Sequence, residues 1–543
     1  MLKEKDIQPR AQVADITEAM FDDKENINAR EVIHKGMNAE EYFWFLNANG
    51  LFEDMENFKF VVDFCEVIKK QGGRALMVGG SVRDEIMKKP IKDYDLEVYG
   101  LDPELLREII SDFGHTKETG SAFAVIKLKA PHGEVDVSLP RRESKTGKGH
   151  KDFAISADPS MSIKEAASRR DFTMNSMAKD PLTGEIFDYF SGMEDLQNGI
   201  LKVTDSEKFV EDPLRVLRAV QFIGRMDLML EDESANLIRK IRPELKYLSK
   251  ERFTAEWEKL LLRSRQPSLA LRSAMELGIF HEMHPEVVAL ARTPQEADWH
   301  PEGDVWTHTL MAVDKAANII KENGVTGDDA FIIMLATFCH DFGKPATIKF
   351  ENGRVRALGH EEAGVEPTGK FLTEIGVENL KIRKTVFKLV AEHLRPISLY
   401  NSEIRHNQKV SDGAIEKLAK DLAPATIEQL VMVSRADKLG RGPFVDKNDP
   451  EKSFMPKEYP AGDWLLERAR NLRVSSKEKP KPVLMGRDLI QLGHKPSSDF
   501  GLLINAVDNL RTRKNISREE VLEIVREHKE KSLAEIADIF NKV

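Results

Sequence analysis

The first half of the chain alternates between stretches with helical spacing and stretches with strand-like spacing of hydrophobic residues. Residues 58–70 place hydrophobic side chains three or four positions apart, which predicts a helix. Residues 75–78 form a short apolar run that ends at Gly79 and Gly80, and this pattern predicts a buried strand followed by a tight turn. Residues 93–99 alternate at period two, which predicts a second strand.

Three more short stretches have strand patterns, and much of the remaining chain has helical spacing. The strand patterns cover residues 122–129, 134–139 and 185–190. Residues 231–272 carry many charged side chains at helical spacing, and one helix opens at 251–257. We therefore expect an α+β protein, in which a small mixed sheet with flanking helices is followed by helical regions.

The composition limits the classes of protein to which the chain can belong. At 543 residues the chain is too long for one hydrophobic core, so we expect several domains. Its formal net charge of −10 does not indicate nucleic acid, and a polynucleotide partner would need a local basic face. Two cysteines, Cys65 and Cys339, are too few for a disulfide framework or a zinc cluster and favour the cytoplasm. Residues 1–30 are charged and no long apolar span follows, so we expect no membrane partner.

The glycine turn and the second strand carry the first candidate chemistry. Gly79 and Gly80 let the backbone approach a phosphate closely, and Ser81 can cap the helix that follows. Asp93 and Asp95 stand at i and i+2, which puts both carboxylates on one face of the strand. Such a pair suits Mg²⁺ that carries a nucleoside triphosphate. The plainer alternative is a turn followed by a solvated strand edge.

The segment that follows offers a third carboxylate and a basic loop. Val135 and Val137 alternate with Asp136, which therefore points away from the apolar face and can join Asp93 and Asp95. A solvent-facing residue on a half-buried strand has the same pattern. Residues 141–151, RRESKTGKGHK, are basic and contain glycine. They predict either a solvated loop or a mobile element over an active site.

A pair of adjacent arginines suits a triphosphate. Arg169 and Arg170 supply planar, permanently charged donors, although arginine pairs are also common on protein surfaces. Asp171 can accept from a ribose hydroxyl, and Asn175 can do the same or brace the turn.

The segment FVEDPLRVLR begins a helix that can read a base. Glu211 and Asp212 precede Pro213, which is tolerated at a helix start. Asp212 and Arg215 are three residues apart, hence neighbours on one helical face. The plain interpretation is an acid that balances the helix dipole and pairs with the arginine. The sharper one is an acceptor beside a donor, which matches the amino group and ring nitrogen of cytosine and adenine and rejects uracil and guanine.

Together, GGSVRD, KDYDLEV, RRDFTMN and EDPLR resemble the motifs of the class II tRNA nucleotidyltransferase and bacterial poly(A) polymerase superfamily. The resemblance implies addition of CCA to the 3′ end of tRNA from CTP and ATP, with release of pyrophosphate. It implies a Mg²⁺-dependent catalytic set of Asp93, Asp95 and Asp136. It also implies a nucleotide-binding set of Gly79, Gly80, Arg83, Arg169, Arg170, Asp171, Asn175, Glu211, Asp212, Arg215 and Arg218.

A second set of motifs begins after residue 299, in the order VWTHTL, CHDFGK, GHEEAG, LVAEHL and SRADKLGR. Any single histidine is more simply a packed or surface residue, but the ordered set resembles the HD phosphohydrolase superfamily. Imidazoles and carboxylates of this kind hold one or two divalent metals, either a transition metal or Mg²⁺. The implied metal ligands are His308, His340, Asp341, His360, His393 and Asp437.

These resemblances set the expected domain boundaries: an N-terminal extension at 1–54, a nucleotidyltransferase head at 55–204, a helical neck at 205–272, an HD domain at 273–445 and a helical tail at 446–543. Two alternatives stay open within this reading. A poly(A) polymerase or a partial CC- or A-adding enzyme shares nearly every motif of the head. In a different class, an HD phosphohydrolase would use the head as a nucleotide sensor. The sequence predicts no oligomeric state.

Overall fold

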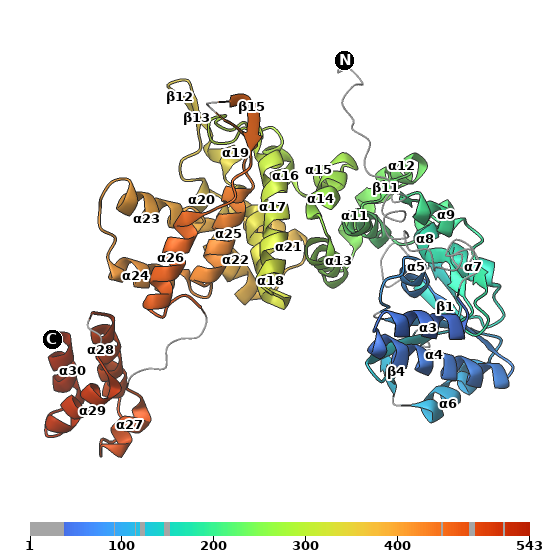
Figure 1. The fold of residues 1–543 in the computed structure, drawn as a ribbon, viewed down its shortest axis with the longest axis horizontal. Helices are drawn as coiled ribbons and strands as arrows, with labels where there is room; N and C mark the ends of the chain where they lie inside the picture. The colour runs from blue at the N-terminus through green and yellow to red at the C-terminus, as the bar shows by residue number, and fades with distance from the viewer. Residues whose placement is uncertain are drawn as a thin grey trace. The chain divides into compact units, whose positions relative to one another are not determined.

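The computed structural model describes residues 37–91, 93–114, 116–119, 125–145, 153–446, 449–476, 484–513 and 516–542. The chain divides into two compact units, Met1–Met283 and His284–Val543 (Figure 1). The predicted N-terminal extension lies outside the described residues as far as residue 36.

The first unit contains the mixed sheet that the sequence predicts. Its seven strands run in the order β3-β4-β5-β2-β1-β8-β9. Strands β2 and β5 are parallel, whereas the other neighbours are antiparallel. The strands are β1 (Arg74–Val78), β2 (Tyr94–Tyr99), β3 (Thr116–Thr119), β4 (Val125–Ala130), β5 (Gly133–Ser138), β8 (Ala178–Lys179) and β9 (Ile186–Phe187).

The last strand is shorter than the period-two pattern of 185–190 suggests. Only β9 is extended, and the chain then turns into α9 (Gly192–Gln197). Asp188 accepts from the backbone N–H groups of Gly192 and Met193 at 2.8 and 2.9 Å, which draws the chain out of the sheet. Ser191 adopts a left-handed conformation with φ 58° at this turn. Side-chain capping of this kind competes with strand pairing.

Two helices pack behind the sheet. The predicted helix at 58–70 is the C-terminal part of α4 (Phe52–Lys70), whose Phe64 and Ile68 are buried. Helix α3 (Ala39–Ala48) covers α4, and the rings of Tyr42 and Phe58 meet edge to face at 4.6 Å.

The turn after β1 has the backbone geometry that glycine allows. Gly79 has φ 69° and begins α5 (Gly80–Ile86). Ser81 does not cap this helix as the sequence suggests, because its hydroxyl donates to the carbonyl of Val78 at 2.9 Å. The N-terminal N–H groups of α5 therefore have no side-chain cap.

From residue 200 onward the first unit is mostly helical. Gly224 lies where α11 meets α14, and a Cβ atom on it would stand 2.8 Å from the Ala270 Cβ, so glycine permits this close packing. This region also contains a short parallel pair of strands, β10 (Ile200–Leu201) and β11 (Met229–Leu230). The helices are α10 (Ser206–Phe209), α11 (Leu214–Met226), α12 (Asp232–Ile241), a 3-10 helix at Arg242–Tyr247, α13 (Lys250–Arg263), α14 (Pro267–Glu276) and α15 (Ile279–Met283).

The second unit is built around a helix that is hydrophobic on all sides. Helix α18 (Gly327–Cys339) is buried at every residue from 330 to 339, and α17 (Val305–Glu322), α22 (Leu380–Glu392) and α25 (Ile427–Leu439) pack against it (Figure 1). The remaining helices here are α16 (Pro285–Leu290), α19 (Lys344–Thr347), α20 (His360–Ala363), α21 (Val365–Glu374), α23 (Arg395–Ile404), α24 (Asp412–Leu422) and α26 (Pro460–Asn471).

Two hairpins interrupt this helical region. The first pairs β12 (Lys349–Glu351) with β13 (Arg354–Arg356), and the second pairs β14 (Phe444–Asp446) with β15 (Asp449–Phe454). The first turns at Asn352 and Gly353, which have φ 51° and 73°, the conformation that an Asn-Gly hairpin turn requires.

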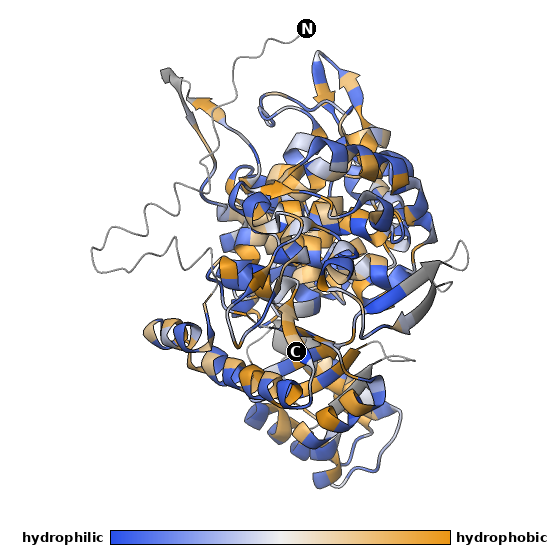
Figure 2. Ribbon diagram, turned by 90° about the vertical axis from the view of Figure 1, so that its right-hand side faces the viewer, coloured by the Kyte–Doolittle hydropathy of each residue, from blue (hydrophilic) through white to orange (hydrophobic). Residues whose placement is uncertain are grey.

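The C-terminal helices have a hydrophobic core of their own, formed by residues such as Leu503, Val521 and Phe540. They are α27 (Gly486–Gln491), α28 (Asp499–Arg513), α29 (Arg518–Glu527) and α30 (Leu533–Lys542). Hydrophobic and hydrophilic residues are mixed along the helices of the molecule (Figure 2). Over the described residues, none of the helices combines the length and the apolar character that a membrane span needs.

Candidate functional site

The sheet register brings two of the predicted carboxylates together. Asp95 on β2 and Asp136 on β5 are paired residues of neighbouring parallel strands. Asp93 is exposed and immediately precedes β2. A Cβ atom on Gly79 would lie 3.9 Å from Asp95 Oδ2 and 3.8 Å from Arg170 Nη1. The glycine turn, the strand carboxylate and an arginine of the RRD motif therefore meet at one place.

The charges at this place are crowded. The pKa of Asp95 is raised to about 6, chiefly by burial and next by the nearby carboxylate of Asp136. The cation of Arg170 lowers this pKa, but by less than Asp136 raises it. Lys127 Nζ lies 3.1 Å from Asp136 Oδ1 and 2.9 Å from Glu134 Oε2. Carboxylate oxygens arranged in this way suit a hard divalent cation such as Mg²⁺.

The two adjacent arginines keep part of their surface open. Arg170 Nη2 lies 3.1 Å from Glu97 Oε2, and Tyr99 donates its hydroxyl to the same carboxylate. Arg169 Nη2 lies 3.9 Å from Glu211 Oε2. The side chains of Arg169 and Arg170 retain 15% and 18% exposure, so both can reach an anion in the site.

Arg83, in contrast, is used inside the protein. It is 5% exposed, its Nη1 donates to Asn175 Oδ1 at 2.7 Å, and its Nε donates to Asp84 Oδ1 at 2.9 Å. Its guanidinium lies over the Phe222 ring, 5.6 Å from the centroid. These bonds favour a structural role for Arg83, although its Nη2 lies 3.4 Å from where a Cβ atom on Gly80 would stand. Contact of Arg83 with a triphosphate stays a prediction.

Asp171 is also a bracing residue. Its carboxylate accepts from Asn175 Nδ2 at 3.0 Å, from the Phe172 backbone N–H at 2.8 Å and from Arg218 Nε at 2.6 Å. Burial raises the pKa of Asp171, but Arg218 and these hydrogen bonds outweigh burial and the net shift is downward. Asp171 is 6% exposed, which favours this bracing role, and its contact with a ribose hydroxyl stays a prediction. Asn175 braces the turn, one of the two roles that the sequence allowed.

The EDPLR segment at the start of α11 has partners outside its own helix. Arg215 donates from Nη1 to the Lys208 carbonyl at 2.7 Å and from Nη2 to the Arg169 carbonyl at 2.6 Å. Asp212 Oδ2 lies 2.8 Å from Arg252 Nη2 on α13. The sequence interpretation of an Asp212–Arg215 ion pair missed Arg252, since a partner 40 residues away leaves no local signal.

The basic segment at 141–151 is described only at its start. Strand β6 (Arg141–Lys145) pairs with β7 (Phe153–Ala157), and residues 146–152 lie outside the described residues. Arg142 anchors this hairpin through Asp158 Oδ2 at 2.8 Å and Glu165 Oε1 at 2.9 Å.

In the second unit, all four histidines of the predicted metal-ligand set have their Nδ1 atoms fixed by acceptors. His340, His360 and His393 donate from Nδ1 to the backbone carbonyl three residues earlier, at 2.6, 2.7 and 2.8 Å. His308 Nδ1 lies 2.9 Å from Glu302 Oε1. These contacts assign the tautomer that leaves a lone pair on each Nε2, the arrangement typical of metal-binding histidines.

The free Nε2 atoms converge on Asp341. His308 Nε2 and His340 Nε2 are 3.3 Å apart, as are His360 Nε2 and Asp341 Oδ1. His340 Nε2 lies 3.1 Å from the other oxygen, Asp341 Oδ2. Lone pairs that face one another at these distances repel unless a cation lies among them. Among the described residues, three triads satisfy the geometry of a metal site. His308–His340–Asp341 and Asp341–His360–His393 share the one carboxylate, and His300–Glu302–His308 shares His308 with the first.

The structure adds three charged residues that the sequence analysis did not identify. Lys344 Nζ lies 2.7 Å from Asp341 Oδ2. Arg441 binds Asp437 with Nη2 at 2.7 and 2.8 Å from the two oxygens. Burial raises the pKa of Asp437, but Arg441 and the histidines outweigh burial and hold it well below its usual range. Lys344 and Arg441 follow these acids by three and four residues, a spacing from which the sequence could have predicted both pairs. The third charged residue is Glu302, the partner of His308, and it has no such local signal.

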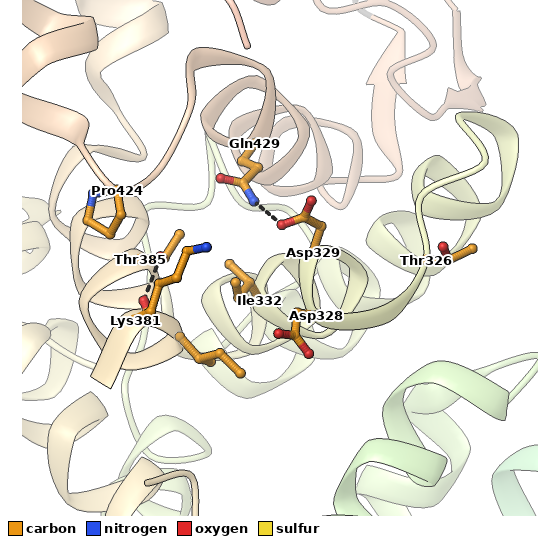
Figure 3. Close-up of a pocket in the computed structure, with 9 residues that line it drawn as sticks. Thr326, Asp328, Asp329, Ile332, Lys381, Thr385, Pro424 and Gln429 are labelled. Atoms are coloured by element: carbon orange, nitrogen blue, oxygen red, sulfur yellow. Dashed lines mark hydrogen bonds between the residues drawn. The ribbon is translucent and has the colours of Figure 1, made fainter. Parts of the chain in front are cut away.

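A cavity of about 180 Å³ lies at the opposite ends of the same helices (Figure 3). Asp329 on α18, Lys381 on α22 and Gln429 on α25 line it, and Gln429 Nε2 donates to Asp329 Oδ1 at 3.0 Å. Asp329 and His340 are 11 residues apart on α18, roughly 16 Å along the helix axis. The cavity is therefore separate from the histidine cluster.

Three family models match the chain. They are the poly A polymerase head domain at residues 75–202, the probable RNA and SrmB-binding site of polymerase A at 227–290, and the HD domain at 305–442.

Curated relatives match over most of their length. The multifunctional CCA protein of Xanthomonas campestris pv. campestris (strain B100) is 32% identical over 416 residues, which cover 75% of this chain and 94% of the relative. That of Pasteurella multocida (strain Pm70) is 31% identical over 392 residues, 70% of this chain and 88% of the relative.

Solved structures share the fold at lower identity. An apo form of a CCA-adding enzyme has a TM-score of 0.55 and 18% identity, and the match covers 86% of this chain and 95% of the other. The CCA-adding enzyme of Thermotoga maritima, complexed with tRNA, has a TM-score of 0.51 and 16% identity, with coverage of 92% and 98%.

Proposed function

Because this chain belongs to the family of the multifunctional CCA proteins, we propose that it adds CCA to the 3′ end of tRNA from CTP and ATP and releases pyrophosphate. One observation carries the proposal. Asp95 and Asp136 lie side by side on parallel strands, next to the glycine turn and Arg170. Metal-binding carboxylates, backbone donors for phosphates and a planar cation are the parts that nucleotidyl transfer requires.

The side chains at the sheet have separate roles in this proposal. Asp93, Asp95 and Asp136 would hold Mg²⁺, which neutralises charge on the triphosphate and favours ionisation of the attacking hydroxyl. Gly80 offers an uncapped backbone N–H group at the start of α5 to the phosphates, and Gly79 supplies the turn before it. Arg169 and Arg170 balance the charge of the pyrophosphate that leaves when the 3′-hydroxyl attacks the α-phosphate.

The start of α11 would select the base. Arg215 holds the carbonyls of Lys208 and Arg169, which fixes its guanidinium plane in the recognition segment. Arg252 holds the Asp212 carboxylate in place. Glu211, close to Arg169, completes the recognition segment. An acceptor and a donor positioned in this way favour cytosine and adenine.

The histidine cluster would act as a metal-dependent phosphohydrolase. His308, His340, Asp341, His360, His393 and Asp437 offer an imidazole-rich ligand set, which favours a transition metal over Mg²⁺. Such metals activate water for attack on a phosphate ester. Lys344 and Arg441 supply cationic charge beside the cluster.

We assign the chemistry to the predicted domains: the head at 55–204, the neck at 205–272, the HD domain at 273–445 and the tail at 446–543. The buried free thiols of Cys65 and Cys339 suit the reducing cytoplasm, where tRNA is processed.

One assay tests the transferase. The protein is incubated with tRNA that lacks its 3′ end, with each triphosphate singly and all together, and the products are sequenced. Addition of C, C and A in that order is expected. A long A tail, a product that stops at CC, or no extension would overturn the proposal in favour of a poly(A) polymerase, a partial enzyme or a nucleotide sensor.

A further inference from the structure

We propose that the β12–β13 hairpin binds single-stranded RNA and presents the RNA end to the histidine cluster. The inference rests on the proposed phosphohydrolase function of that cluster. It deepens that function by naming the substrate class, a polynucleotide end instead of a free nucleotide.

In the sequence, the hairpin stands between two of the predicted metal ligands. It lies between Asp341 and His360, so the chain leaves one ligand, forms the hairpin and returns to the next (Figure 1). Ala357, the residue directly after β13, accepts the Nδ1 hydrogen bond of His360 at 2.7 Å. The base of the hairpin is therefore bonded to a ligand of the cluster.

The base of the hairpin carries two cations that face each other. Lys349 and Arg356 are paired residues of the antiparallel ladder, and both are exposed. Like charges directly opposite each other destabilise a hairpin. In the part of the chain that the structure describes, neither side chain has an ion pair, whereas the pair nearer the tip, Glu351 with Arg354, is of opposite charge. A phosphate between Lys349 and Arg356 would relieve the repulsion through charge-assisted hydrogen bonds.

The other face of the hairpin offers an aromatic ring. Phe350 is paired with Val355 and is 75% exposed. Exposed aromatic rings beside basic side chains are the platform on which proteins stack unpaired bases. A two-stranded ribbon is narrow, so one RNA strand can meet the cations with its backbone and the ring with a base. The hairpin carries three basic side chains and one acidic side chain, and Arg354 is paired with Asp298. The local basic character that RNA requires is therefore concentrated at the base of the hairpin, at Lys349 and Arg356.

The hairpin is also held in place before any ligand binds. The Val355 backbone N–H donates to Glu296 Oε2 at 2.9 Å, and Arg354 Nη2 lies 3.8 Å from Asp298 Oδ2. Asn352 and Gly353 close the tip with a turn that matches the strand twist. Preorganisation of this kind lowers the entropic cost of binding.

The test compares two substrates in the intact protein. One is a short unpaired oligoribonucleotide that ends in a 2′,3′-cyclic phosphate, and the other is 2′,3′-cyclic AMP. The variants are Phe350→Ala and the double change Lys349→Ala with Arg356→Ala. The matched control is Lys384→Ala with Lys388→Ala, which removes two exposed cations from α22 of the same unit.

We expect KM for the oligonucleotide to rise about tenfold in each hairpin variant, while KM for 2′,3′-cyclic AMP and the control variant stay within about twofold. The double variant should also reduce the salt dependence of the oligonucleotide KM. Phe350→Trp should keep the wild-type KM. An unchanged oligonucleotide KM, or an equal rise for both substrates, would overturn the proposal.

If the wild-type protein hydrolyses neither substrate, the phosphohydrolase function fails, and ultraviolet cross-linking then decides on the hairpin alone. Cross-links of the oligonucleotide to residues 349–356 would support RNA binding. Cross-links confined to other residues would overturn it.

Discussion

Asp95 and Asp136 occupy paired positions on the parallel strands β2 and β5, so two carboxylates stand next to each other where the sheet meets the glycine turn. The first prediction follows from this pair. Asp95→Asn or Asp136→Asn should reduce kcat for CCA addition by at least about a hundredfold, because a lost metal ligand removes several kcal/mol of charge stabilisation. The assay is single-turnover addition to tRNA with Mg²⁺. Glu134→Gln, on the same face of β5 as Asp136, is the control and should keep most activity; equal loss in the control would contradict the assignment.

The raised pKa of Asp95 has a consequence for stability without metal. Its folded pKa of about 6 lies above the unfolded value, so the native state binds more protons between about pH 4 and 6. Stability of the metal-free protein should therefore decrease as pH rises through this window. Asp95→Asn should remove this slope and raise stability at pH 7 by about 1–3 kcal/mol. Urea unfolding in EDTA at several pH values measures how the free energy of unfolding depends on pH. If this dependence is the same in Asp95→Asn as in the wild type, Asp95 is not its cause.

The contrast between Arg83 and Arg170 gives a third prediction. Arg83→Met should lower the free energy of unfolding by about 1–3 kcal/mol, because it leaves the buried Asn175 amide oxygen without its donor. KM for triphosphates, measured in the folded variant, should hardly change. Arg170→Met should have the opposite profile, a raised KM for CTP and ATP with little change in stability. Initial-rate kinetics and thermal unfolding of both variants separate the two roles, and a large KM increase in Arg83→Met would show that Arg83 binds the triphosphate.

Base choice should depend on Asp212 and Arg215. Removing either side chain should slow addition of C and A and narrow the preference over UTP and GTP by about ten- to a hundredfold, since a good base contact is worth about 1–3 kcal/mol. Arg252→Ala should produce a smaller change in the same direction, because it only releases Asp212. All four triphosphates are measured well below the unfolding temperature. Lower stability with unchanged selectivity would leave these residues a purely structural role.

The two sites should be separable by mutation. His340→Ala with Asp341→Ala should abolish metal-dependent hydrolysis of 2′,3′-cyclic phosphates and spare CCA addition, because these ligands belong to a different compact unit from Asp95. Glu302→Gln should weaken metal binding about ten- to a hundredfold through its contact with His308. Metal content after dialysis and both activities are measured together. Loss of CCA addition in a folded double variant would show that the units are coupled.

Local sequence pattern predicted the parts of the protein whose chemistry is local. The alternation around Asp95 and Asp136 placed both on strands, and their register then brought them together. Local pattern could not predict in which direction a side chain leaves its helix. It also could not predict which residues of distant segments would be its partners. Arg83 points into the protein against Phe222, and Arg252 reaches Asp212 from another helix.

Some signals were present in the sequence and were not used. Asn352–Gly353 between alternating residues is a strong hairpin signal, yet the region was expected to be helical. Arg441 follows the predicted metal ligand Asp437 by four residues, just beyond the end of α25, and the two side chains form an ion pair.

The position of Asp341 in two of the triads limits how this domain can diverge in evolution. A descendant that loses His360 and His393 still has His308, His340 and Asp341, so a simpler site survives. A descendant that loses Asp341 breaks both of these triads in one step. The domain can therefore lose His360 and His393 and keep a complete triad, whereas loss of the shared aspartate leaves neither of these two triads complete.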